Sequence, residues 1–394
     1  MTTTVPLTPV PLPNLGHAFE RYLLDDIVPF WMDHALDPRG GLNTCIGDDG
    51  SVISRDKFMW SQLRAIYTFS ALYNYIEPRQ QWLDTAAGLV QFCARHGRDE
   101  QGRWVFRVSP EGRLIEGAIS IGTDSFALLG LCEYYRASGD AAALRLARDT
   151  YDSVTHRLWL PGPYPLAPYE IPPGLDAHAI SMAFSLAFHE LALVTKDDGI
   201  GRAALACAVK VMDRFRQPQR RALVEFVHLD GALEDSPPGR AVVPGHAIES
   251  MWFQIHQFQH HGMKDRIRQC LECLRWHMEL GWDQQYGGLR LGLDLDGKEP
   301  IYWKFHDAKL WWPQTEALYA LQLAHAISGE PWCLDWYWRL HRIAFTHYPV
   351  PGHGEWRQRL DRQFRPFDAV VALPVKDPFH LPRALMLMIR LLRA

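Results

Sequence analysis

The chain has 394 residues, of which 47% are hydrophobic and 22% charged, a globular balance that excludes a disordered or low-complexity fibrous protein. Its 41 lysines and arginines against 45 aspartates and glutamates give a net charge of −4, so no basic excess is available to neutralise phosphates and no nucleic-acid partner is expected. The first residues lack the charged and apolar regions of a secretory signal, and no uncharged apolar run reaches the roughly 18 residues of a membrane span, so we expect a soluble, cytoplasmic protein without a membrane partner.

Apolar residues recur at three- to four-residue spacing along most of the chain, which predicts amphipathic helices. The helices are expected at residues 14–36, 57–76, 79–97, 121–138, 140–157, 177–195, 197–216, 245–262, 264–281, 309–328, 330–347 and 376–393. Short links join the two members of each pair, which is typical of antiparallel neighbours. Longer glycine-containing segments between pairs, such as 99–117 and 285–300, alternate apolar and polar residues and predict small β-hairpin excursions.

The paired helices favour a closed barrel over an open solenoid, because the pairs share no repeat of fixed length and the long excursions all fall between pairs. We therefore expect an all-α fold, an (α/α)6 barrel of six inner and six outer helices with the excursions at one end. No linker rich in proline and serine divides the chain, so residues 1–394 are expected to form a single catalytic domain. Parallel inner helices would gather their N-termini at one end of the barrel.

Cysteine and histidine spacing does not indicate a metal centre. The seven cysteines are scattered, and the close pair Cys270 and Cys273 falls inside a helical stretch without a second such pair. His256 and His260 are four apart on a helix, but the sequence suggests no third ligand. We expect neither a metal nor a disulfide framework.

The first segment of chemical interest is the predicted helix that contains Trp60 and Arg64. Residues four apart share a helix face, so these two side chains lie together. An arginine among so many apolar residues is costly to bury unless it meets an anion. That anion is either a substrate or the carboxylate of a neighbouring helix.

The second segment, VVPGHAIESMWF, places His246 and Glu249 three residues apart at a helix start. A carboxylate on the same face can hold the imidazole in one tautomer, as a catalytic histidine requires. The same spacing is also found in N-terminal capping arrangements.

Two further helix starts carry polar and aromatic residues. Lys309, Trp312 and Glu316 surround the start of one helix, and His380 lies at the start of the last. His246 and His380 would therefore lie at the same end of a closed barrel. Imidazoles suit both the removal and the return of a proton at neutral pH, and a proton next to a sugar carbonyl is such a target. Its removal leaves an enediolate, which needs cationic or hydrogen-bonding groups around its oxygens.

The segments KFMWSQLRAIYTFSALYN, PGHAIESMWF, KLWWPQTEALYAL and FHLPRAL, in this order, resemble the N-acylglucosamine 2-epimerase family, which includes cellobiose 2-epimerases and mannose-type aldose–ketose isomerases. The resemblance implies a barrel of six inner and six outer helices and a homodimer that acts on free, unphosphorylated sugars without a catalytic metal. No cofactor is implied, although ATP activates some members; the sequence has no glycine-rich phosphate-binding motif.

The resemblance also implies the catalytic roles. His246 and His380 correspond to the acid/base pair on opposite faces of C2, and Arg64 to the arginine that holds the oxygens of the open-chain sugar. Glu249 corresponds to the carboxylate that orients His246, and Glu316 to a second essential carboxylate.

Four further residues are expected to bind the substrate. Trp60 and Trp312 would shape the pocket, and Lys309 is a further candidate. His178 resembles a third active-site histidine of the cellobiose epimerases and the isomerases, and a capping or supporting position for it stays open.

The resulting expectation is a sugar 2-epimerase that interconverts N-acetylglucosamine and N-acetylmannosamine, with a mannose-type isomerase or a cellobiose 2-epimerase as the alternative within the family. Outside the family, an inverting glycosidase would use two of the carboxylates Asp124, Glu249 and Glu316 about 6.5–9.5 Å apart. A binding protein without turnover would have no need of the two histidines.

Overall fold

The structure, a computed structural model, describes residues 4–158, 164–299 and 304–393, and its helices agree closely with the periodicity of the sequence. The helices are α1 Leu12–Tyr22, α2 Val28–His34, α3 Met59–Tyr75, α4 Gln80–His96, α5 Gly122–Ser138, α6 Ala141–Leu158, α7 His178–Thr195, α8 Asp198–Lys210, α9 Pro244–His260, α10 Lys264–Gly281, α11 Trp311–Ser328, α12 Pro331–His347 and α13 His380–Arg393. π-Helical turns at Leu23–Ile27 and Val211–Phe215 join α1 to α2 and extend α8. The last helix begins at His380 rather than at residue 376.

Short antiparallel strands occupy the connections between helix pairs. They are β1 Cys45–Ile46, β2 Val52–Ser54, β3 Lys57–Phe58, β4 Arg107–Val108, β5 Leu114–Glu116, β6 Leu175–Ala177, β7 Arg216–Gln217, β8 Ala222–Leu223, β9 Phe226–His228, β10 Ala241–Val242, β11 Leu293–Asp294, β12 Lys309–Leu310 and β13 Arg359–Leu360. The hairpin expected in 99–117 is present as β4 and β5, which extend onto β3. The prediction of a hairpin within 285–300 is wrong, because the strand β11 in this segment pairs with β10 from the preceding connection.

The helices form two classes that differ in burial. The inner helices α3, α5, α7, α9, α11 and α13 are buried on most of their surface; in α11 every residue from Pro313 to Ala324 is buried. The outer helices bury one stripe, as α6 does with Ala143, Ala147 and Val154. A helix surrounded by protein must be apolar on all sides, whereas one on the surface needs a single apolar face. Helix α7 is long and apolar enough to match a membrane span. It is 61% buried and packs between α5 and α9, which accounts for its apolar composition.

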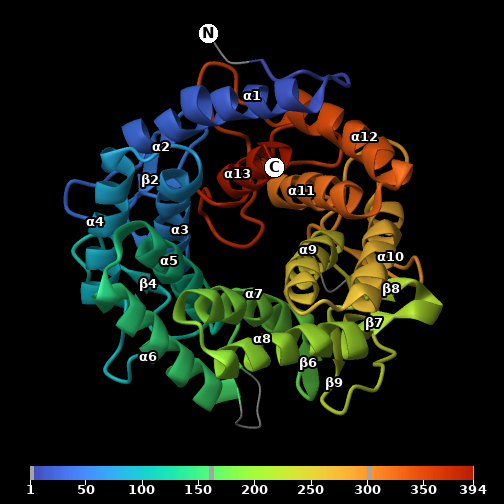
Figure 1. The fold of residues 1–394 in the computed structure, drawn as a ribbon, viewed down its shortest axis with the longest axis horizontal. Coiled ribbons are helices and arrows are strands. Elements are labelled where there is room, and N and C mark those ends of the chain that lie inside the picture. The colour runs from blue at the N-terminus through green and yellow to red at the C-terminus, as the bar shows by residue number, and fades with distance from the viewer. Residues whose placement is uncertain (1–3, 159–163, 300–303, 394) are drawn as a thin grey trace.

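The inner helices contact one another in chain order, and α13 also contacts α3 (Figure 1). Outer helices α4, α6, α8, α10 and α12 each pack on the inner helix that precedes them, and α1 packs on α13. The links inside each pair are short, whereas the strands lie in the long connections that lead into the inner helices. The inner helices therefore begin at the end of the molecule that carries the long connections.

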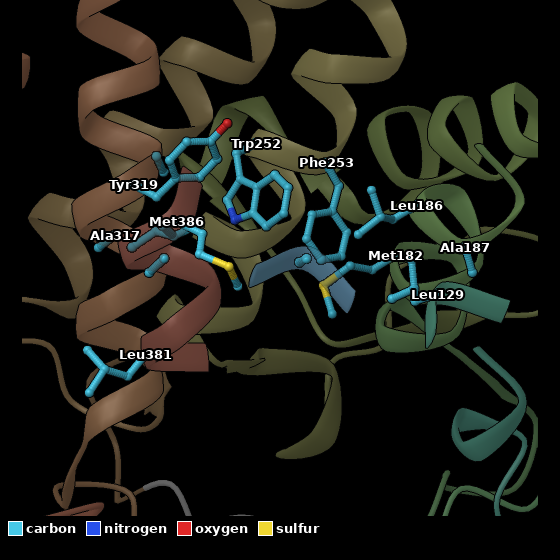
Figure 2. Packing of buried hydrophobic residues seen from close by; sticks show 14 of the residues in the cluster. Leu129, Met182, Leu186, Ala187, Trp252, Phe253, Ala317, Tyr319, Leu381 and Met386 are labelled. Atoms are coloured by element: carbon cyan, nitrogen blue, oxygen red, sulfur yellow. The ribbon is translucent and has the colours of Figure 1, made fainter. Parts of the chain in front are cut away.

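Aromatic side chains occupy the interior between neighbouring inner helices. Figure 2 shows Trp252 of α9 between Tyr319 of α11 and Phe253, with Met182 of α7 beyond. The Trp252 ring centroid lies 5.1 Å from that of Tyr319 and 4.3 Å from that of Phe253, both edge-on. Such edge-to-face pairs add stabilisation beyond the burial of area.

The packing of α5 against α3 depends on Gly130. A Cβ atom at this position would lie 2.4 Å from the Leu63 carbonyl oxygen of α3. Backbone cannot move aside as a flexible side chain can, so we predict that Gly130→Ala lowers the free energy of unfolding by about 1–3 kcal/mol. Gly88→Ala on α4 is the matched control, since a Cβ there meets nothing within 4 Å. Because alanine favours helix, the control should stabilise by up to about 1 kcal/mol; urea unfolding measures both, and equal effects would contradict the packing argument.

Candidate active site

A cavity of about 260 Å³ opens at the end where the inner helices begin. Its walls combine the first turns of the inner helices with the long connections that precede them. The helical lining residues include Trp60, Arg64, Phe126, His246, Glu249, Phe253, Trp311, Trp312, His380 and Arg383. The arrangement brings residues more than 300 positions apart in the sequence to one site.

The two histidines are each held by a carboxylate at the same ring nitrogen. His246 Nδ1 lies 3.1 Å from Glu225 Oε2, and His380 Nδ1 lies 2.7 Å from Glu316 Oε1. An ionised carboxylate can only accept a hydrogen bond. Each Nδ1 therefore carries a hydrogen atom and donates a hydrogen bond to its carboxylate. This tautomer leaves Nε2 of each imidazole as the nitrogen that can take up a proton.

Trp312 packs against both imidazoles. Its ring centroid lies 5.1 Å from that of His246 and 5.8 Å from that of His380. The approach to α9 requires Gly245, because a Cβ there would lie 2.6 Å from the Trp312 ring. Because Gly245 has no side chain, the Trp312 ring can pack against His246.

Arg383 connects Glu316 to a third carboxylate of the site, that of Glu249. Its Nη2 donates to Glu249 Oε1 and, at 2.8 Å, to Glu316 Oε1. Ligand atoms of Glu249, Glu316 and His380 lie within 4.8 Å of one another, which is close enough for a metal ion. The guanidinium of Arg383 already supplies a positive charge to both carboxylates at that position.

Arg64 lies over the faces of three aromatic rings at the cavity wall. Its guanidinium carbon is 4.0 Å from the centroid of Phe126, 4.6 Å from that of Trp60 and 5.0 Å from that of Phe379. Nη1 donates to Asp377 Oδ1 at 3.0 Å. Arg64 therefore meets a protein carboxylate, which was one of the two anions expected for it.

The second carboxylate oxygen of Asp377 fixes the start of α13. Oδ2 accepts from the backbone N–H of His380 at 3.0 Å and from that of Phe379 at 3.3 Å. A carboxylate that accepts from the first free N–H groups of a helix caps it. Asp377 thus couples the position of Arg64 to that of His380.

The charges of the site favour ionised carboxylates. Burial raises the pKa of Glu316, but Arg383 and His380 outweigh burial and lower the pKa to about 2. Burial likewise raises the pKa of Glu225, while His246 and His178 lower it to about 2. Burial lowers the pKa of His246, whereas Glu225 raises it, and the net direction is upward.

The structure gathers most of the predicted site residues. Trp60, Arg64, Trp312, Glu249 and both histidines line the cavity, and Glu316 is buried behind His380. The predicted pairing of Glu249 with His246 is wrong. Although the two residues share a helix face, Arg383 binds the Glu249 carboxylate and Glu225 reaches Nδ1 of His246 instead.

Two predicted substrate-binding residues do not line the cavity. Lys309 is fully buried, and its Nζ donates to the carbonyl oxygens of Gly287 at 2.8 Å and Gly288 at 3.2 Å. His178 is also fully buried; its Nε2 lies 3.0 Å from Ser250 Oγ, and its Nδ1 lies 3.8 Å from Glu225. Lys309 thus supports a connecting loop, and His178 takes the supporting position left open by the sequence.

Sequence reasoning missed Glu225 and Arg383. Glu225 stands in the apolar run Ala222–His228 between β8 and β9, where a buried carboxylate is unusual and marks a specific partner. Arg383 follows His380 by three residues and so shares its helix face. The sequence thus singles out both residues, but the side chains that they bind come from other elements of the chain.

Comparisons with known proteins show what the chain is similar to in sequence and in fold. The sequence model of a family described as N-acylglucosamine 2-epimerase (GlcNAc 2-epimerase) matches residues 40–382. The chain is 28% identical over 375 residues to N-acylglucosamine 2-epimerase of Bos taurus, covering 92% of this chain and 87% of that protein. The structure of cellobiose 2-epimerase from Bacillus thermoamylovorans has a TM-score of 0.83 and 19% identity, covering 96% and 99% of the two chains. A D-mannose isomerase structure has a TM-score of 0.79 and 17% identity, covering 96% and 97%. At these identities the two structures show a shared fold.

The Glu225 carboxylate provides a test of how His246 is held. Glu225→Gln removes the charge that raises the pKa of His246, so the limb of the pH profile of kcat/KM that reports His246 should move to lower pH. Loss of the fixed tautomer should also lower kcat by about 10²-fold. Glu355→Gln, the same change at another buried carboxylate, is the control and should leave the pH profile in place. An unshifted profile in Glu225→Gln would show that the contact does not tune His246.

Proposed function

Because the chain belongs to the N-acylglucosamine 2-epimerase family and is thus a sugar isomerase, we propose that it interconverts N-acetylglucosamine and N-acetylmannosamine by proton transfer at C2. The observation that carries the proposal is the pair of imidazoles at one cavity, each with Nδ1 held by an ionised carboxylate. Two such units provide one base and one acid for a single carbon.

The proposed reaction begins with the open-chain sugar, whose aldehyde makes the C2 proton acidic. Nε2 of one histidine removes this proton, and the electron pair passes to the carbonyl oxygen to form an enolate whose C2 still carries the acetamido group. Nε2 of the other histidine then donates a proton to the opposite face of C2, and the aldehyde at C1 is restored. The removal of one proton and the return of another balance the reaction and invert C2.

The developing negative charge is best stabilised by Arg64. Its guanidinium lines the cavity and, among the described residues, is paired with the single carboxylate of Asp377, so positive charge remains for the enolate oxygen. Buried N–H groups of Trp60, Arg64, Trp311 and Arg383 at the cavity wall have no hydrogen-bond partner among the described residues. Unpaired buried donors cost about 1–3 kcal/mol each, and their concentration at one cavity favours a ligand rich in oxygen.

The carboxylates do not suit the glycosidase alternative. Oxygens of Glu249 and Glu316 lie within 4.8 Å of each other, whereas inverting glycosidases need about 6.5–9.5 Å between the carboxyl groups. Arg383 lowers the pKa of Glu316, which disfavours a neutral carboxylic acid that could protonate a leaving group. Asp124 is bound to Arg157 at 2.6 Å and does not line the cavity.

The position of His178 favours the epimerase over the isomerase and disaccharide branches. Resemblance to those branches would give His178 contact with the substrate, but here it is buried behind Glu225. We also infer that the inner helices close into an (α/α)6 barrel, because α13 contacts both α11 and α3.

Proton NMR of N-acetylmannosamine in D₂O tests the reaction directly. We expect N-acetylglucosamine to form with deuterium at C2, in the presence of a chelator and without ATP, because the proposed acid and base are both imidazoles that exchange with solvent. A ketose product would place the protein with the isomerases. Absence of any change with both N-acetylated sugars would refute the proposed substrate.

Removing one histidine at a time separates the two half-reactions. In His380→Asn and in His246→Asn, epimerisation should fall by at least about 10²-fold. The remaining imidazole should still exchange the C2 proton of one epimer with D₂O, and the two variants should retain exchange with different epimers. His17→Asn, on the exposed face of α1, is the control and should keep full activity. Full epimerisation in either active-site variant would exclude the two-base mechanism.

A further inference from the structure

A second cavity, of about 630 Å³, lies at the other end of the inner helices, where the short links join the helix pairs. Its lining comes from the middle and last turns of the inner helices, with Phe379 just before α13, and its polar residues include Glu133, Arg136, His189, Glu190, His256 and Arg390. None of the catalytic histidines reaches it, so the proposed reaction leaves this cavity without a use.

The polar groups of the second cavity are fixed in place by one another. Arg136 donates to Glu133 Oε2 at 2.8 Å and to Glu190 Oε2 at 2.5 Å. His256 Nε2 lies 2.9 Å from the hydroxyl of Tyr319. A pre-organised polar lining loses little entropy when a ligand binds.

The formal charges of the lining balance. Glu133 and Glu190 face Arg136 and Arg390, and the guanidinium of Arg383 is bonded to Glu249 and Glu316 on the catalytic side. Burial lowers the pKa of His256 to about 4, so this imidazole is neutral at pH 7. Two carboxylates would repel a polyanion such as a triphosphate, and the balance of charges favours a neutral ligand.

Aromatic rings surround these polar groups. Tyr67, Tyr75, Trp252, Tyr319 and Phe379 all contribute to the lining, and Arg390 covers the ring of Tyr75 at 3.9 Å. Flat apolar rings beside hydrogen-bond donors and acceptors match the two kinds of surface that a sugar presents, its C–H faces and its hydroxyls. We propose that the second cavity is a non-catalytic binding site for a neutral sugar.

The second cavity shares a wall with the catalytic cavity. Leu129 and Arg383 line both cavities, and Phe379 lines the second. The ring centroid of Phe379 lies 4.2 Å from the guanidinium carbon of Arg383. The same guanidinium binds the carboxylates of Glu249 and Glu316 in the active site. A sugar in the second cavity therefore lies against Arg383, the residue that holds both of these carboxylates.

Equilibrium dialysis with radiolabelled N-acetylglucosamine tests the site by counting sugars per chain; only the choice of this sugar rests on the proposed function. We expect the wild-type protein to bind two and Leu193→Trp to bind one, because Leu193 lines the mouth of the second cavity and is 42% exposed. The control Leu229→Trp, an exposed leucine away from both cavities, should still bind two. Thermal melting of all three proteins checks that each is folded.

The outcomes separate this proposal from the proposed function. A wild-type count that Leu193→Trp leaves unchanged overturns the second site, whether or not the enzyme epimerises the sugar. A single sugar that is lost in Leu193→Trp supports the second site even if N-acetylglucosamine is not the substrate. Displacement of the sensitive sugar by ATP and not by glucose would overturn the assignment of a neutral ligand.

Discussion

The arrangement of the active site depends on the ion pairs that the guanidinium of Arg383 makes. This guanidinium is buried on α13 and bonds Glu249 of α9 and Glu316 of α11, so three inner helices meet at one cation. Burial of any one of these charges alone costs several kcal/mol, and removal of one partner from a buried pair typically costs about 3–5 kcal/mol. The three charges are therefore stable only together, and Glu316, once held there, fixes the ring of His380.

The histidines reach the same cavity through different local structures. His246 lies in the first turn of α9 and takes its carboxylate from the strand segment before that helix, whereas His380 begins α13 and takes its carboxylate from α11. In both cases the carboxylate lies at Nδ1, which leaves Nε2 as the ring nitrogen that can accept a proton. The long connections thus contribute Glu225 and Asp377 as well as the cavity walls.

The side chains at the two ends of the inner helices differ in chemistry. Their first turns carry the histidine–carboxylate pairs and Arg64, while their last turns carry a balanced set of charges among tyrosines. Arg383 lines both cavities, and Phe379 of the second cavity contacts it. A change in packing at this wall therefore alters the support of both carboxylates that Arg383 binds.

The helices, their pairing and most of the residues proposed for the site could be predicted from the amino-acid sequence, and most of these residues do lie at one cavity. Apolar periodicity and helix-start signals are local, so they can be recognised without knowledge of neighbouring elements. The same locality explains the errors. The pairing of Glu249 with His246 followed from a shared helix face, and the placing of Lys309 at the substrate followed from its position beside two tryptophans. Which carboxylate holds which imidazole can be seen only in the folded chain, since Glu225 and Arg383 come from other elements and a buried charge binds whichever opposite charge the packing brings nearest.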